Sequence, residues 1–123
     1  MRLIWIGLAS FFGGISRYLV EGWISSATRG TFPWGTLAVN ASGSFLLGFI
    51  FTVMTERFLP HPDFRVAVTA GFLGAYTTFS TFAFETFRLG EDGAIVLASL
   101  NVVASVLAGV IAVWLGIVAG RAL

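Results

Sequence analysis

Four long apolar runs joined by short links constrain this chain more than any other feature. Each run is close to the ~20 residues that an α-helix needs to cross the hydrocarbon core of a bilayer. We expect one domain over residues 1–123 with four transmembrane helices, at about residues 3–24, 34–53, 66–87 and 94–118. Because a helix satisfies its own backbone groups in lipid, the predicted fold class is an all-α integral membrane protein.

Composition supports this class and excludes others. The chain is 57% hydrophobic and 11% charged, whereas charged residues make up about 25% of a soluble domain. There is no cysteine, so no disulfide framework or thiol chemistry is expected. The basic residues lie between the apolar runs and form no patch, so no nucleic-acid partner is expected. His61 lies between two prolines with no nucleophile beside it, and we predict that the protein is not an enzyme.

The third run does not have the pattern of a plain membrane helix. Gly71 and Gly74 each weaken a helix by roughly 1 kcal/mol relative to alanine. Four hydroxyl residues then lie within five positions, Thr77, Thr78, Ser80 and Thr81, and four phenylalanines are threaded among and after them: Phe79, Phe82, Phe84 and Phe87. An interrupted membrane helix is tolerated only where its backbone is buried in protein or lines a wet cavity. We therefore expect a third helix that is broken near the midplane and handles an ion.

The second run carries one stripe of polar and small residues. Thr36, Asn40, Ser44 and Gly48 recur every four residues, which places them on one helical face. Asn40 has the strongest polar group in the stripe. Taken alone, Asn40 is best interpreted as a residue that makes a hydrogen bond between helices. Taken together with the third run, the stripe favours an ion pathway.

The first run contains a charged pair, Arg17 and Glu21, on one helical face. An arginine inside a membrane span marks a functional site by default. The alternative is a short first helix in which Arg17 reaches the interface and pairs with Glu21. A vestibule position, close to the interface and facing the ions, satisfies both interpretations.

The fourth run has a polar face and a packing motif. Asn101 and Ser105 share a face that continues at Gly109, and residues 116–120 form a GxxxG motif. Polar stripes on three helices are hard to bury within one thin bundle. A two-fold dimer is the simplest way to bury them.

The loop arginines predict orientation only weakly. With Arg17 set aside, four arginines lie on the side of both termini and two on the other: Arg2, Arg57, Arg65 and Arg121 against Arg29 and Arg88. This shallow bias is compatible with insertion in both orientations, and equally with sampling noise in a short chain.

Three motifs are similar to those of a known family. GTLAVNASGSFLLG at 35–48, GFLGAYTTFSTF at 71–82 and GG-x-x-R-Y at 13–18 closely resemble the CrcB/Fluc family of microbial fluoride channels. The resemblance runs along essentially the whole chain. It implies an antiparallel, dual-topology homodimer with two fluoride pores along the subunit interface. It also implies a multi-pass protein of the bacterial plasma (inner) membrane, surrounded by lipid, that exports fluoride and relieves its toxicity.

The resemblance also assigns residues. It implies that the fluoride pore is formed by Asn40, Phe79 and Phe82, with the polar residues Ser80, Thr81, Thr36 and Ser105. Arg17 and Glu85 are implied at the vestibule. A structural Na⁺ at the dimer centre is implied on the backbone carbonyls of Gly74 and Thr77. Two positions depart from the family pattern. Ala75 stands where a second glycine is frequent, and Asn101 stands where several members carry tyrosine.

Fluoride is small and strongly hydrated, so hydrogen-bond donors and the positive edges of phenylalanine rings must replace its water. One rival is a proton-coupled exporter resembling the small multidrug-resistance proteins, which needs a lone membrane carboxylate. Glu21 is the only first-helix candidate, and Arg17 would neutralise it. A second rival is a structural partner subunit with no transport of its own. The polar stripes of the second and third runs argue against it, because helix packing alone needs fewer hydroxyl groups.

Overall fold

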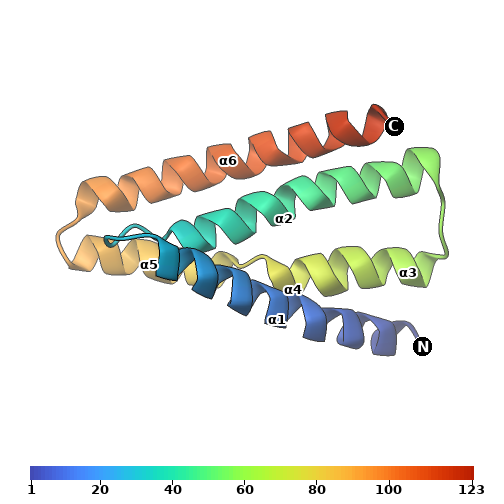
Figure 1. The fold of residues 1–123 in the computed structure, drawn as a ribbon, viewed down its shortest axis with the longest axis horizontal. Coiled ribbons are helices and arrows are strands. Elements are labelled where there is room, and N and C mark those ends of the chain that lie inside the picture. The colour runs from blue at the N-terminus through green and yellow to red at the C-terminus, as the bar shows by residue number, and fades with distance from the viewer.

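The computed structural model describes residues 1–123 and consists entirely of helices and short links (Figure 1). Its elements are α1 (Arg2–Ala27), α2 (Trp34–Thr52), η1 (Val53–Arg57), α3 (Pro62–Val66), η2 (Ala67–Leu73), α4 (Gly74–Tyr76), α5 (Phe79–Glu91) and α6 (Ile95–Arg121). They form four helical spans, each long and apolar enough to cross a membrane. The predicted all-helical, multi-pass architecture is therefore confirmed.

Two of the spans contain wide, π-helical turns. Span two is α2 continued by the π-helical η1, and span three is built from α3, the π-helical η2, α4 and α5. Figure 1 shows α6 alongside α2, α1 alongside the third span, and both chain termini at the same end of the bundle. π-Helical turns are rare and often occur at functional sites. Here η2 leads directly into the segment with the densest run of hydroxyl residues.

Small residues set the distance between α2 and α6. Gly48 of α2 lies against the carbonyl of Val113, and Gly116 of α6 lies against the carbonyl of Phe45. A Cβ at either glycine would collide with the backbone of the other helix. The GxxxG motif therefore packs α6 against α2 inside the protomer.

The packing of α1 against η2 also depends on glycine. Gly13 lies against the carbonyl of Phe72, and a Cβ on Gly71 would come within 2.9 Å of the Ile6 carbonyl oxygen. The Ser10 hydroxyl donates to the Gly71 carbonyl at 3.2 Å. Gly71 thus serves the approach of α1, and the chain remains helical at this residue.

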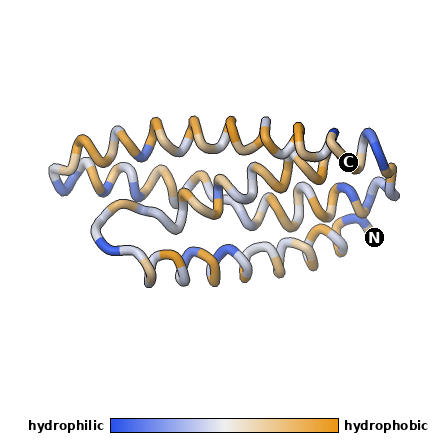
Figure 2. Tube along the Cα trace, turned by 45° about the horizontal axis from the view of Figure 1, so that its top comes forward, coloured by the Kyte–Doolittle hydropathy of each residue, from blue (hydrophilic) through white to orange (hydrophobic).

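Most of the surface is apolar. Only 16 of the 123 residues are buried, far fewer than a water-soluble core of this chain length would need. Side chains such as Val110 and Trp114 of α6 are 65% and 60% exposed. Hydrophobic residues follow the helices along most of their length, while hydrophilic residues gather at the links and ends (Figure 2). Such an exterior is stable when its surroundings are apolar as well.

Candidate functional site at the α4–α5 link

The link between α4 and α5 consists of two extended residues. Thr77 has φ −88° and ψ 157°, and Thr78 has φ −148° and ψ 116°. Both are β-branched, and this side-chain type favours extended backbone. The link frees backbone groups that would be paired in a continuous helix, and in a membrane span each of these groups needs a partner.

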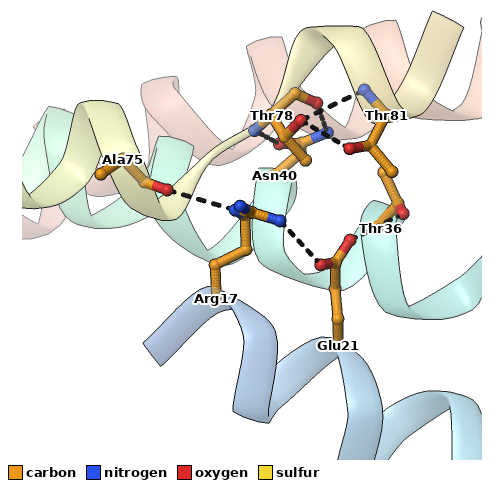
Figure 3. Close-up of polar contacts among 7 residues, drawn as sticks. All are labelled: Arg17, Glu21, Thr36, Asn40, Ala75, Thr78 and Thr81. Carbon is orange, nitrogen blue, oxygen red and sulfur yellow. Dashed lines mark hydrogen bonds and ion pairs between the residues drawn. The ribbon is translucent and has the colours of Figure 1, made fainter. Parts of the chain in front are cut away.

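Asn40 of α2 supplies two of those partners. The Thr78 N–H donates to Asn40 Oδ1 at 2.7 Å, and Asn40 Nδ2 donates to the Thr78 carbonyl at 2.9 Å (Figure 3). The Asn40 side-chain amide therefore pairs with both backbone groups of Thr78, as a residue of a neighbouring β-strand would. A carboxamide has two N–H donors, so one N–H of Asn40 remains after both contacts to Thr78 are made.

The threonine side chains complete the helix ends on either side of the link. Thr78 is the N-cap of α5: its Oγ1 accepts from the Thr81 N–H at 3.2 Å and donates to Thr81 Oγ1 at 3.0 Å. Thr77 closes α4, since its N–H and its hydroxyl both donate to the Leu73 carbonyl. The hydroxyl proton of Thr81 has no acceptor within the protomer, which leaves Thr81 free to donate to an anion.

On the other side of the link, α1 makes contact through Arg17. Its Nε donates to the Ala75 carbonyl at 3.2 Å, and its Nη1 lies 3.1 Å from Glu21 Oε2. The other Glu21 oxygen accepts from the Thr36 hydroxyl at 3.0 Å. A cation beside the last carbonyls of a helix is electrostatically favourable. Arg17 and Asn40 thus bind neighbouring parts of the same interruption from α1 and α2 (Figure 3).

A cavity of about 300 Å³ opens at the link. Its lining includes Asn40, Ser44, Gly74, Thr77, Thr78 and Phe79. The cavity therefore lies between Asn40 and Ser44 of the polar stripe on α2 and the two residues predicted to hold Na⁺, Gly74 and Thr77. No side chain donates to the carbonyl of Gly74 or Thr77, so both oxygens are free to serve as ligands, and oxygen ligands suit a hard cation. The residues present therefore fit the implied ion.

The two predicted pore phenylalanines lie together at the start of α5. The ring centroids of Phe79 and Phe82 are 5.7 Å apart, and the ring planes are inclined at 55°. Phe79 is 79% exposed on the single protomer, whereas Phe82 is half-buried. Their spacing directs both rings toward the same side of α5.

Seven predicted site residues do not line this cavity. Arg17, Thr81 and Phe82 are described above, and the other four lie elsewhere. Ser80 is exposed and its side chain makes no hydrogen bond. The Thr36 hydroxyl donates to Glu21, and the Ser105 hydroxyl donates to Asn101 Oδ1 at 3.2 Å, so neither proton is free. Glu85 lines a second cavity of about 440 Å³ with Arg88, and its Oε1 is buried without a hydrogen-bond partner.

Sequence reasoning missed several partners at the site. The peptide group of Thr78 and the Ala75 carbonyl were not among the predicted contacts, although they anchor Asn40 and Arg17. Tyr76, whose hydroxyl lies 2.9 Å from that of Ser42, was also missed. Only Thr78 carried a signal, because a threonine before a new helical segment is a common N-cap.

Comparison with known proteins gives a consistent result along the chain. The family described as "CrcB-like protein, Camphor Resistance (CrcB)" matches residues 4–117. A protein of Geotalea daltonii named "Fluoride-specific ion channel FluC" is 47% identical over 119 residues, which cover 97% of this chain and 96% of the relative. Proteins with the same name from Citrifermentans bemidjiense and Geobacter sulfurreducens are 46% and 48% identical, covering 98% and 90% of those relatives.

Proposed function

Because this chain belongs to the CrcB family, we propose that it is a fluoride-selective, passive ion channel. In this proposal it lets F⁻ leave the cell across the bacterial plasma membrane and so relieves fluoride toxicity. The observation that carries the proposal is the full-length similarity to proteins named fluoride-specific ion channels. The family consists of channels, so the chain is not an enzyme.

The local geometry supports a path for an anion. Three hydrogen-bond donors without an acceptor in the protomer lie within a few residues of the link: the second Asn40 N–H and the hydroxyls of Ser80 and Thr81. The edges of the Phe79 and Phe82 rings carry partial positive charge and can face a small anion. We assign these five residues to the fluoride pore. Because the donors are neutral, they can replace water without holding the ion too tightly to conduct.

Arg17 and Glu85 are proposed to act at the ends of this path. Arg17 is about one-third exposed and lies beside the link, and Glu21 offsets part of its charge. Arg17 can therefore attract anions more weakly than an unpaired arginine would, without binding them tightly. Thr36 and Ser105 belong to the proposed path as hydrogen-bond partners of Glu21 and Asn101, and neither has a free proton for the ion.

We further propose that the working unit is an antiparallel homodimer. The cavity at the link is open on the single protomer, and Phe79 and Gly74 are exposed there. A second copy would close this face, and a two-fold axis would bring two sets of link carbonyls together. In such a dimer the carbonyls of Gly74 and Thr77 would hold a structural Na⁺. Its positive field would offset part of the desolvation cost of a nearby anion.

The proton-coupled exporter is less well supported. That mechanism needs a carboxylate free to exchange a proton for a cationic substrate. Glu21 instead uses one oxygen for Arg17 and the other for Thr36. No relative reported above is named as an exporter.

A halide efflux assay tests the proposal. Purified protein is reconstituted in liposomes loaded with potassium fluoride or potassium chloride, with equal pH on both sides, and efflux is started with valinomycin. We expect rapid fluoride release and hardly any chloride release. Equal release of both halides would contradict selectivity, and fluoride release only under a proton gradient would show coupled transport in place of passive conduction.

A further inference from the structure

Asn101 is the most deeply buried polar side chain of the protein. It is 1% exposed, and Val39 is the only other large side chain that is buried as completely. Its neighbours in α6 are almost all aliphatic. An amide in such surroundings is costly unless its groups are hydrogen-bonded. Asn101 does not line the cavity at the α4–α5 link, and its bond to Ser105 accounts only for its side-chain oxygen.

A directional chain of hydrogen bonds runs from α6 through Asn101 to α5. Ser105 Oγ donates to Asn101 Oδ1 at 3.2 Å, and Asn101 Nδ2 donates to Thr86 Oγ1 at 2.8 Å. Thr86 Oγ1 in turn donates to the carbonyl of Phe82 at 2.8 Å. Since the only hydroxyl proton of Thr86 goes to Phe82, Thr86 can only accept from Asn101. The contact therefore requires an amide N–H at position 101.

A contact from another helix is needed to fix the orientation of α5 about its own axis. The helix has 13 residues and follows a two-residue extended link, so α4 does not fix its rotation. Asn40 holds the chain just before α5 begins, through Thr78. Asn101 holds it two turns later, from α6, at the residue that is bonded to the Phe82 carbonyl. A rotation of α5 would turn the side that carries both Phe79 and Phe82 away from the ion path.

We propose that Asn101 is a positioning residue for the Phe79–Phe82 pair: its amide fixes the rotation of α5 through Thr86 and so aims the two rings at the ion path. The inference rests on the proposed fluoride channel. It assigns Asn101 no contact with the ion. Its role is to decide which part of α5 faces the ion.

The test compares Asn101→Leu with the double variant Asn101→Leu/Thr86→Val. Leucine has a similar size and no donor, so the single variant leaves Thr86 without its partner. The double variant makes the pair apolar and removes the unsatisfied group at Thr86, which restores stability if burial alone matters. The Ser105 hydroxyl loses its acceptor in both variants and can donate to a carbonyl of its own helix instead. Ser99→Ala is the matched control, because Ser99 lies exposed on α6 and its side chain makes no hydrogen bond.

We expect both Asn101 variants to lose fluoride efflux by about tenfold, as for one buried hydrogen bond, with a lower fluoride-to-chloride ratio. The double variant should unfold near the wild-type temperature and still conduct poorly. Fluoride efflux within about twofold of wild type and unchanged selectivity in the double variant would overturn the inference. That result differs from failure of the proposed function, in which the wild-type protein itself releases no fluoride and the inference falls with it.

Discussion

The side-chain amide of Asn40 pairs with both backbone groups of Thr78, at 2.7 Å to its N–H and 2.9 Å to its carbonyl. Thirty-eight residues separate the two in sequence. The pairing lets the chain leave the helical conformation inside a membrane span without an unsatisfied peptide group at Thr78. The interruption between α4 and α5 thus depends on a side chain of α2.

Replacing Asn40 should therefore destabilise the protein as well as impair conduction. Asn40→Leu leaves a peptide N–H and a carbonyl without partners, at about 1–3 kcal/mol each. Asn40→Asp keeps the acceptor for the N–H and loses the donor, so it should fall between leucine and the wild type. Thermal unfolding in detergent, followed by tryptophan fluorescence, measures the order of the three. An Asn40→Leu protein as stable as the wild type would show that the pairing is dispensable.

Phe82→Ile should abolish most fluoride efflux while the protein remains folded. The substitution keeps an apolar side chain of similar bulk and removes the positive ring edge and the contact with Phe79. Liposome efflux and gel filtration measure the two properties. Phe87→Ile is the matched control, because Phe87 is 66% exposed and lies further along α5. Normal efflux in Phe82→Ile would exclude aromatic coordination of the ion.

Gly116→Ala should destabilise the α2–α6 contact. A methyl group at Gly116 meets the backbone of Phe45 and Phe49, which cannot move aside as a flexible side chain can. Overpacking of this kind costs about 1–3 kcal/mol. Gly7→Ala is the control: no atom lies within 4 Å of its Cβ position, and alanine favours a helix. Equal unfolding temperatures for the two variants would argue against the packing role of Gly116.

Removing sodium should reduce fluoride efflux or the unfolding temperature. The proposed Na⁺ ligands are the backbone carbonyls of Gly74 and Thr77, and the chain has no group of three or more His, Cys, Asp or Glu side chains that could hold a metal ion instead. Protein purified and assayed in N-methyl-D-glucamine salts is compared with the same protein after sodium is restored. Indifference of both efflux and stability to sodium would remove the ion from the account.

Sequence periodicity was sufficient for the helices and for the face of α2 that carries Asn40, because both follow from spacing along one segment. It could not identify partners across helices. Asn101 and Thr86 lie on separate helices, and only the packing of α5 against α6 brings their side chains to 2.8 Å. Similarly, the positive charge of Arg17 was evident, but its contact with the Ala75 carbonyl depends on where α1 crosses the third span.

The sequence predicted an interrupted third helix, but not which of its residues are extended. Gly71 and Gly74 have the weakest helix propensity in that segment, yet both remain helical, and the extended residues are Thr77 and Thr78. Close packing accounts for Gly71, since α1 approaches it too closely for a Cβ. The freed backbone groups thus lie where Asn40 supplies hydrogen-bond partners to Thr78, and not at the residues of weakest helix propensity.

The reversal potential of the current in a planar bilayer tests passive fluoride selectivity most directly. With a tenfold gradient of potassium fluoride across reconstituted protein and equal pH, the potential should lie near the fluoride equilibrium value of about 59 mV. It should not move when a chloride or pH gradient is added. A potential that follows the chloride or pH gradient, or no fluoride current at all, would contradict the account.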